Sequence, residues 1–374
     1  MQTSDKAAFQ TIAIVGVGLI GGSLAVALRR AGFQGEIIGV SSGPTIEEGL
    51  KDGVIDAGFE YKGLLQAASR ADLIILASPI HRILDHIREL GHGHESLRSD
   101  CIITDVGSTM ASIVEEAEAS LPEKVSFIGG HPMAGSEKRG LSSADPFLFQ
   151  NAFYILTPAR NVSSETVGVL KDFLGTTGAR MMVLDAKEHD RSAAIISHMP
   201  QLLSVVLVNF LEHYAENRDD TLRLAAGGFR DMTRVASSPF PMWRDIYETN
   251  GDEVRTAVDA FVQELRKTAE LIGTDALRER FDTAAHTRVR IPRDSKGFVN
   301  PLWEVLVVVE DKPGIITTIA QTLSDSDINI KDIEVVKVRE GEGGSLRLAF
   351  STEAVARKAV RLLSAQDFSV RLRE

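Results

Sequence analysis

The sequence predicts an α/β fold with a parallel sheet covered by helices on both faces, followed by an all-helical domain and a small βαββαβ domain. Three observations predict this organisation. Short apolar runs alternate with helical patterns in the first half of the chain, which is typical of a parallel sheet between two helical layers. The strand signal stops near Ala186, and long apolar stretches without turn residues follow. From residue 303 onward, strand and helix patterns return in the order βαββαβ.

Length and composition limit the possible classes. The chain has 374 residues, which favours two or three domains at about 150 residues each. Its 25% charged and 44% hydrophobic residues exclude a disordered or fibrous chain. The net charge of −11 disfavours a nucleic-acid binder, because that class needs a basic surface. The single cysteine, Cys101, excludes an internal disulfide, and its apolar surroundings predict a buried thiol.

Neither a metal nor a membrane is expected as a partner. His92 and His94 lie in a Gly-rich loop without carboxylates at useful spacing, so we expect no metal site. Residues 1–10 contain no apolar segment behind a basic start. No apolar run reaches the roughly 18 residues that a membrane span needs. These features predict a cytoplasmic protein.

The first domain is expected to span residues 1–185. Each of its strand patterns is a short apolar run bounded by Gly, Pro, Ser or Asp. The predicted strands are 11–15, 36–40, 72–77, 101–106, 125–128, 153–157 and 180–184. Helical patterns lie between them at 19–30 and 110–120, and a further helix face is formed by Val167, Leu170, Phe173 and Leu174.

The second domain, residues 186–284, is expected to be helical. Pro200 should kink a helix or separate two helices, because it cannot donate a backbone hydrogen bond. The segment 202–211 is apolar nearly all round, and such a helix is buried. We expect a homodimer through this domain, with burial inside one chain as the alternative.

The third domain, residues 303–374, follows a polar linker at 285–302. Strand patterns at 304–309, 328–338, 345–350 and 368–372 alternate with two helix faces. These faces are marked by Ile316, Ile319, Ala320 and Leu323, and by Ala356, Val360 and Leu363. The order βαββαβ is that of a ferredoxin-like domain.

A glycine motif predicts a dinucleotide site. Gly16-Val17-Gly18-Leu19-Ile20-Gly21 follows the first strand and opens a helix, the context that this fingerprint requires. Its glycines permit a tight turn, close approach of a pyrophosphate, and close packing of helix on strand. We therefore predict a Rossmann-type doubly wound sheet. The expected cofactor-binding residues are Gly16, Gly18, Leu19, Ile20, Gly21, Ser41 and Ser78.

The second strand does not identify the cofactor. An NAD site usually has an acidic residue at the end of this strand, and an NADP site has an Arg nearby. Here the strand ends in Gly39-Val40-Ser41-Ser42, so NAD and NADP both stay open.

Two further segments carry candidate chemistry. His131 follows a strand at the carboxyl edge of the sheet, where such folds bind ligands, and it is the candidate catalytic base. Arg230 and Arg234 are four residues apart and share a face if the segment is helical. Their guanidinium groups suit carboxylates, and surface ion pairing with Asp231 is the alternative.

Together these motifs resemble the prephenate/arogenate dehydrogenase family of tyrosine biosynthesis over nearly the whole chain. The resemblance is carried by Gly16–Gly21, Asp105–Ser108, His131–Lys138, Ser197–Pro200 and Phe229–Arg234. The third domain is similar to an ACT domain, with Asp311–Gly314 opening its helix and Asn329-Ile330 at its second strand.

The resemblance implies oxidation of prephenate at its ring carbinol by hydride transfer to NAD or NADP, with NAD slightly favoured, and loss of CO2 to give 4-hydroxyphenylpyruvate. His131 would take the hydroxyl proton as general base, Ser108 would orient it, and Arg234 would hold the ring carboxylate. An ion network around Arg234, with Arg230, Asp231 and Glu137, is also implied. The implied substrate-binding residues are Arg234, Gln201, Ser136, Glu137, Arg230 and Trp243.

Gln201 departs from the family pattern, because many relatives carry a second His at this position. An amide donates a hydrogen bond but carries no charge. Prephenate therefore stays open against arogenate, the substrate of a cyclohexadienyl-type enzyme.

The ACT resemblance implies tyrosine as a feedback inhibitor bound through Gly314, Asn329 and Ile330, with an ACT domain that binds no ligand as the alternative. Two other functions are alternatives. Another Rossmann dehydrogenase, such as a 2-hydroxyacid type, would use His198 as its acid or base. A non-catalytic amino-acid sensor would not need Ser108 and His131.

Overall fold

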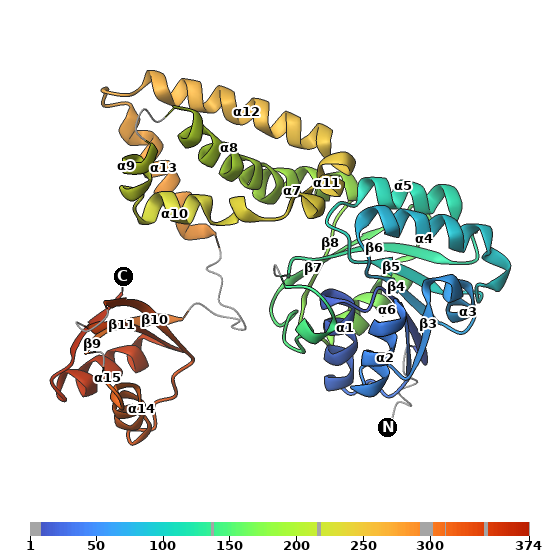
Figure 1. Ribbon diagram of the computed structural model, residues 1–374, viewed down its shortest axis with the longest axis horizontal. Helices are drawn as coiled ribbons and strands as arrows, with labels where there is room; N and C mark the ends of the chain where they lie inside the picture. Colours follow the sequence, from blue (N-terminus) through green and yellow to red (C-terminus); the bar gives the residue numbers. More distant parts are fainter. Residues whose placement is uncertain are drawn as a thin grey trace. The chain divides into compact units, whose positions relative to one another are not determined.

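The computed structural model describes residues 9–135, 138–214, 218–291, 302–310, 312–339 and 343–373. The chain divides into two compact units, residues 1–278 and 279–374 (Figure 1). The first unit contains the large sheet and the helices that follow it. The second contains the small sheet.

The first domain is an eight-stranded sheet with helices on both faces, which confirms the predicted fold class (Figure 1). The strand order is β3-β2-β1-β4-β5-β6-β7-β8, and its first six strands have the order of a dinucleotide-binding Rossmann fold. The strands are β1 (Thr11–Val15), β2 (Glu36–Ser41), β3 (Ala57–Glu60), β4 (Leu73–Leu76), β5 (Ile102–Asp105), β6 (Ser126–Pro132), β7 (Phe153–Pro158) and β8 (Arg180–Val183).

Two features of this sheet differ from the expectation. The edge strand β3 was missed because its four residues, Ala-Gly-Phe-Glu, hold only one large apolar side chain. The pair β6 and β7 is antiparallel, whereas every other neighbouring pair is parallel. A parallel connection needs a crossover, usually a helix. The described part of the connection from β6 to β7 contains only the short 3₁₀ turn η3 (Leu141–Ser143).

Six helices cover the sheet. One face carries α1 (Leu19–Arg30), α2 (Gly43–Lys51) and α6 (Ser164–Gly175), and the other carries α3 (Leu64–Ala68), α4 (Ile80–His92) and α5 (Ala111–Ser120). Short turns η1 (Tyr61–Gly63) and η2 (His94–Ser96) flank α3 and α4. Alternate strand residues point to opposite faces, so Ile12 and Ile14 join one core while Ala13 and Val15 join the other.

The helical domain follows at Ala186. Its elements are α7 (Ala186–Ala193), η4 (Ala194–His198), α8 (Met199–Tyr214), α9 (Arg218–Arg223), α10 (Gly227–Thr233), η5 (Arg234–Ser237), α11 (Phe240–Thr249), α12 (Gly251–Glu270) and α13 (Leu277–Arg290). Pro200 does not separate two helices, because α7, η4 and α8 follow one another without a break. The π-helical turn η4 lies just before Pro200, and such a turn accommodates the hydrogen bond that proline cannot make.

The helical domain leaves a stripe of large apolar side chains exposed. Val206, Phe210 and Tyr214 follow one another at four-residue spacing along α8 and are 52%, 59% and 73% exposed. Among the described residues, two hydrophobic clusters cover the faces of the large sheet and a third belongs to the small domain. Of their buried members, only Ile246 comes from the helical domain. The described residues of the first unit therefore do not bury this stripe.

The continuous helix Ala186–Tyr214 corrects the expectation that no segment is apolar enough to cross a membrane. Within the described residues it passes that test, by length and composition only, and one such helix is weak evidence for a span. Its first half also carries the buried polar side chains of His189, Asp190 and His198. Buried polar groups with protein partners are typical of a helix that lines a site.

The second unit confirms the predicted βαββαβ order. Its elements are β9 (Trp303–Val309), α14 (Ile315–Ser324), β10 (Asp332–Arg339), β11 (Gly343–Phe350), α15 (Glu353–Ser364) and β12 (Ser369–Leu372), and its sheet has the antiparallel order β10-β11-β9-β12. Helix α13 runs to Arg290, so the first part of the predicted linker 285–302 is helical. Residues 292–301 of that linker lie outside the described residues.

Candidate active site

The loop between β1 and α1 has the geometry of a phosphate cradle. Gly16 has φ +100°, and a Cβ there would lie 2.5 Å from the carbonyl oxygen of Ala77. A Cβ at Gly21 would lie 2.1 Å from the Gly16 carbonyl oxygen, whereas one at Gly18 would meet nothing within 4 Å. The first turn of α1 has no acidic residue and no side-chain cap, which leaves its N–H groups for an anion. These residues fit a dinucleotide pyrophosphate.

The other predicted cofactor residues lie at the same sheet edge. Leu19 and Ile20 open α1, and the buried Ser41 ends β2. The Ser78 hydroxyl, just after β4, donates to the carbonyl oxygen of Val15 at 3.2 Å. The strand order reverses between β1 and β4, which is where open α/β sheets bind their ligands.

Glu60 is a carboxylate at this edge that the sequence analysis did not select. It ends β3 and pairs in register with Ser41 of β2. Its Oε1 lies 3.1 Å from the position that a Cβ would take at Gly43, the first residue of α2. An exposed acid therefore stands beside the end of β2, although β2 itself ends without one.

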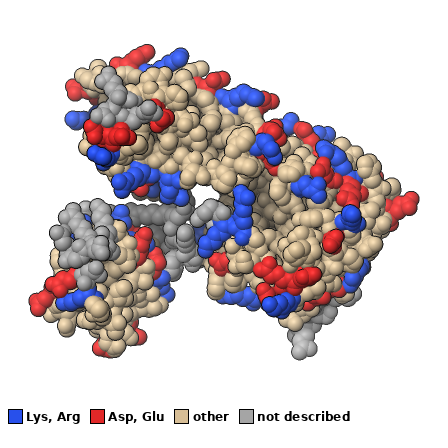
Figure 2. All heavy atoms as spheres, viewed as in Figure 1, with Lys and Arg blue, Asp and Glu red and all other residues tan. Residues whose placement is uncertain are grey.

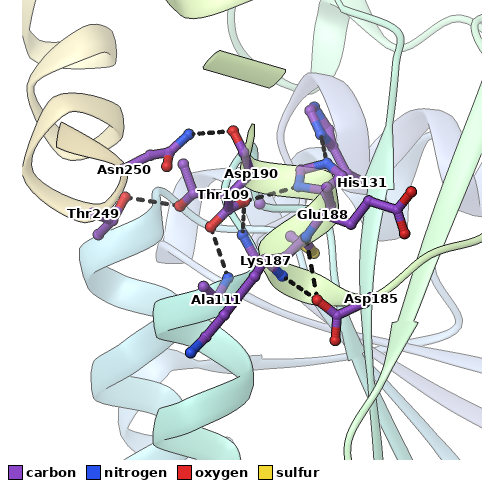
Figure 3. Close-up of polar contacts among 12 residues, drawn as sticks. Thr109, Ala111, His131, Asp185, Lys187, Glu188, Asp190, Thr249 and Asn250 are labelled. Carbon is purple, nitrogen blue, oxygen red and sulfur yellow. Dashed lines mark hydrogen bonds and ion pairs between the residues drawn. The ribbon is translucent and has the colours of Figure 1, made fainter. Parts of the chain in front are cut away.

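His131 belongs to a buried hydrogen-bonded chain that crosses from the sheet to the helical domain. Its Nδ1 lies 2.8 Å from Nε2 of His189 in α7, and Nδ1 of His189 lies 2.8 Å from Oδ1 of Asp190. The two oxygens of Asp190 accept the backbone N–H groups of Met110 at 2.7 Å and Ala111 at 2.8 Å (Figure 3). Asp190 thereby caps the first turn of α5.

The imidazoles of His131 and His198 are neutral near pH 7. Burial lowers the pKa of His131 to about 3, and the nearby rings of His189 and His198 contribute to the shift. Burial also lowers the pKa of His198 to about 4. The side chain of Asn250 lies 3.2 Å from Nδ1 of His198 and donates to the carbonyl oxygen of Asp190 at 2.8 Å. A neutral His131 has a lone pair with which to accept a proton.

Asp105 joins the loop of Ser108 to the strand of His131. Its Oδ2 accepts the N–H of Gly107 at 2.7 Å, and its Oδ1 accepts the N–H of Gly130 at 3.0 Å. Burial raises the pKa of Asp105 to about 7, against these hydrogen bonds, which lower it. Because Gly107 and Gly130 directly precede Ser108 and His131, one carboxyl group fixes the backbone at both positions.

Ser108 is half-buried in the loop between β5 and α5, and the next residue anchors that loop. The Thr109 hydroxyl lies 2.8 Å from the hydroxyl of Thr249 in α11. Within the described residues, the Ser108 hydroxyl has no hydrogen-bond partner, and His131 pairs with His189 instead. The expected contact from Ser108 to His131 is therefore not present in this structure.

The structure brings Gln201 to the segment of Arg234. Gln201 is buried in α8, and its Nε2 donates to the carbonyl oxygen of Val235 at 2.9 Å. Trp243 in α11 packs edge-on against His198, with 6.2 Å between ring centroids. Its indole N–H is buried and has no partner among the described residues.

Arg230 and Arg234 are exposed, in α10 and at the start of η5. In the part of the chain that the structure describes, neither guanidinium nor the Asp231 carboxylate forms an ion pair. The expected ion network is therefore not formed by these three. Ser136 and Glu137 lie outside the described residues.

The predicted effector residues lie at the two ends of α14. Gly314, with φ +89°, caps its N-terminus at the far end of β9. Asn329 and Ile330 precede β10, which starts level with Glu304 at the opposite end of β9, with β11 between the two strands. A ten-residue helix is about 15 Å long. One small ligand therefore does not reach both groups within one chain.

A cavity of about 480 Å³ lies on the far side of Asp190 from His131. Ala111, Thr249 and Asn250, which flank Asp190 in Figure 3, line it. It contains neither His131 nor the glycine loop. Across the described residues, no group of three His, Cys, Asp or Glu side chains is arranged to hold a metal ion.

Several residues of this site were missed from the sequence. Neither His189 nor Asp190 was predicted as a site residue, because the apolar pattern of the helix that follows dominates this part of the sequence. The available signal was a His-Asp pair one turn after the helix cap Asp185. Asp105 was predicted only as part of the motif Asp105–Ser108, with no role of its own. Glu60 ends β3, a strand that was not predicted.

The fold, the glycine cradle and the buried neutral imidazole define a dinucleotide-binding dehydrogenase of the Rossmann class. The prephenate dehydrogenase nucleotide-binding domain matches residues 24–183, the prephenate dehydrogenase dimerization domain matches 185–283, and the ACT domain matches 303–368. The chain belongs to the prephenate dehydrogenase family.

Individual relatives agree with this assignment. The chain is 37% identical to the prephenate dehydrogenase of Bacillus subtilis (strain 168), over 95% of this chain and 96% of that protein. The structure of an Aquifex aeolicus prephenate dehydrogenase in complex with hydroxyphenyl propionate and NAD+ matches with a TM-score of 0.69 and 31% identity, over 76% of this chain and 98% of that one. A Synechocystis arogenate dehydrogenase matches with a TM-score of 0.68 and 30% identity, over 75% of this chain and 100% of that one.

Proposed function

We propose that this enzyme oxidises and decarboxylates prephenate to 4-hydroxyphenylpyruvate, with hydride transfer to NAD, and that tyrosine inhibits it. The buried neutral His131 carries the proposal, because it stands at the sheet edge that holds the glycine cradle and has a lone pair for a hydroxyl proton. A sensor without turnover would have no use for such a base.

The proposed reaction balances with the groups at hand. The cofactor, when bound, supplies a hydride acceptor. The carbinol C–H leaves as hydride, the O–H proton passes to His131, and the C–O bond becomes a carbonyl. The bond from the ring to its carboxylate then breaks and CO2 departs. Its electron pair makes the ring aromatic and passes to the carbonyl oxygen, which takes the proton back from His131 and becomes the phenol hydroxyl. A positioned general base is typically worth ~10²–10⁴-fold in rate.

Arg234 and Arg230 are proposed to receive the substrate carboxylates. Prephenate is a dianion, and both guanidinium groups are exposed and unpaired among the described residues. Guanidinium groups bind carboxylates through two parallel hydrogen bonds. The segment of Arg234 is held by the buried Gln201, whose side chain donates to the carbonyl oxygen of the neighbouring Val235.

Gln201 also fits a second candidate substrate, arogenate. One N–H of its amide donates to Val235, which leaves Oε1 and the second N–H for a ligand. The oxygen can accept from an ammonium group, and the second N–H can donate to a keto group. Arogenate carries the ammonium group, and prephenate carries the keto group.

NAD is proposed over NADP because of Glu60. A carboxylate beside the end of β2 accepts a ribose 2′-hydroxyl and repels a 2′-phosphate. Glu60 supplies that carboxylate from the neighbouring strand, next to Ser41 and Gly43.

A homodimer through the helical domain is proposed from the exposed stripe of Val206, Phe210 and Tyr214. Much of the helical domain's visible surface carries no charge, whereas Lys and Arg are interspersed with Asp and Glu over the large-sheet domain (Figure 2). Contiguous exposed apolar surface marks an interaction site. Phe210→Asp should give a monomer in sedimentation, and an unchanged dimer would show that another surface pairs.

The ACT domain is proposed to bind tyrosine. Gly314 presents a helix N-terminus without an acidic residue, which suits a carboxylate. Because Asn329 lies at the other end of α14, a ligand that touches both groups would lie between two copies of the domain.

A four-way assay tests the proposal: purified enzyme with prephenate or arogenate, each with NAD or NADP. Turnover of prephenate with NAD supports it, and faster turnover of arogenate moves the assignment to the second candidate. Silence in all four arms would overturn both. His131→Asn should lower kcat far more than it changes KM, and a kcat near wild type would refute the base.

A further inference from the structure

We propose that His189 and Asp190 are positioning residues that hold the His131 ring in one tautomer, with its proton on Nδ1 and its lone pair on Nε2. The inference rests on the proposed function and deepens it. Its basis is the chain of two 2.8 Å contacts from His131 through His189 to Asp190.

The acidic end of the chain fixes the direction of each hydrogen bond. Both oxygens of Asp190 accept backbone N–H groups, from Met110 and Ala111, at the N-terminus of α5. A helix N-terminus favours a negative charge, so Asp190 is held as a carboxylate, which only accepts. Nδ1 of His189 must therefore carry the proton that it shares with Asp190.

The same logic continues to His131. In the proposed arrangement His189 carries one proton, on Nδ1, so its Nε2 has a lone pair and accepts from Nδ1–H of His131. The proton of the neutral His131 ring is thereby placed on Nδ1, and its Nε2 is the basic atom. A hydroxyl such as that of Ser108 would not select a tautomer, because it both donates and accepts.

The positioning groups come from a different domain than the base. His131, Met110 and Ala111 belong to the sheet domain, whereas His189 and Asp190 stand on α7 of the helical domain. Asn250 holds the backbone of Asp190 from α11–α12 through a 2.8 Å hydrogen bond. The orientation of the His131 ring therefore depends on how the helical domain packs against the sheet domain.

Nitrogen-15 NMR of the full-length protein, labelled at histidine and free of substrate and cofactor, tests the tautomer directly. Spectra near pH 7.5 report which ring nitrogen carries a proton, and the His131 signals are those lost in His131→Asn. We expect Nδ1 of His131 to be protonated and Nε2 not. A proton on Nε2 of His131, or a cationic His189, would overturn the proposal. This readout needs no turnover, so it stands apart from a failure of the four-way assay.

Variants of His189 separate positioning from packing. His189→Leu removes the acceptor and should lower kcat on the order of 100-fold, with KM changed less than about threefold, and the His131 tautomer should no longer be fixed. His189→Gln restores a carbonyl acceptor and should recover at least about tenfold of that loss. His86→Leu, at a buried histidine away from this chain, is the matched control and should keep kcat. A His189→Leu enzyme with wild-type kcat and tautomer refutes the proposal whatever its melting temperature, and so does His189→Gln with no recovery.

Discussion

Gly18 and Gly21, at the start of α1, should respond to the same substitution in different ways. A Cβ at Gly21 would lie 2.1 Å from the Gly16 carbonyl oxygen and 3.0 Å from the Ile14 side chain, so Gly21→Ala forces α1 away from β1. Overpacking of this kind costs about 1–3 kcal/mol. Gly18 has a negative φ of −99° and open space around its Cβ position, so the methyl group of Gly18→Ala meets no neighbouring atom. Its methyl group would occupy the space into which the pyrophosphate must come.

Thermal unfolding and cofactor titration separate the two effects. Gly21→Ala should lower Tm by about 2–4 °C for each kcal/mol lost, whereas Gly18→Ala should stay near wild type. Gly18→Ala should instead weaken the Kd for NAD about tenfold or more, which corresponds to ~1.4 kcal/mol. Wild-type NAD affinity in Gly18→Ala would show that the pyrophosphate does not lie against this loop. An unchanged Tm in Gly21→Ala would refute the packing argument.

Other predictions follow from single residues. Burial lowers the pKa of His86 from 6.5 to about 4, and neither ring nitrogen has a hydrogen-bond partner among the described residues. The unfolded chain therefore binds a proton that the folded chain does not, and stability falls as pH drops from about 6.5 to 4. His86→Phe should therefore reduce the difference in the free energy of unfolding between pH 7.5 and pH 5, measured with urea, by ~2 kcal/mol. His92→Asn, at an exposed position of the same helix, should leave that difference unchanged. Equal pH dependence in both variants would contradict this reasoning. Glu60→Gln should narrow the ratio of kcat/KM for NAD over NADP at least about tenfold, and an unchanged ratio would remove Glu60 from cofactor choice. Asp105→Asn should lower the free energy of unfolding by ~1–3 kcal/mol and lower kcat, because the amide N–H group then faces one of the two backbone N–H groups that the carboxylate accepts. A fully active and stable variant would show that Asp105 is not needed to hold these loops. Millimolar tyrosine should inhibit the full chain but not a chain without residues 303–374, and equal inhibition of both would place the effector site elsewhere.

The architecture could be read from the sequence because periodicity reports burial. The apolar runs of β1, β2 and β4 lie inside a sheet covered on both faces, so the residues between the ends of these strands are apolar and the signal is strong. The edge strand β3 has no such requirement, and its Ala-Gly-Phe-Glu pattern carries little signal. The direction of β7 depends on the connection that precedes it, which local patterns do not encode.

The site divides in the same way. The cofactor loop is local, so its spacing and strand-helix context were sufficient. The chain from His131 to Asp190 joins positions 58 and 59 residues apart across two domains, and no local pattern brings them together. Gln201 was recognised as unusual, but its bond to Val235, which decides what the amide can offer a ligand, exists only in the folded chain.

The helix from Ala186 to Tyr214 has two different ends. Its first turns carry His189 and Asp190, and its last turns expose Phe210 and Tyr214. Association of two copies through the last turns would also hold the first turns of the same helix, and with them the residues that orient His131. Only paired chains would then have a correctly oriented base. Specific activity would therefore fall on dilution, as the dimer dissociates by mass action.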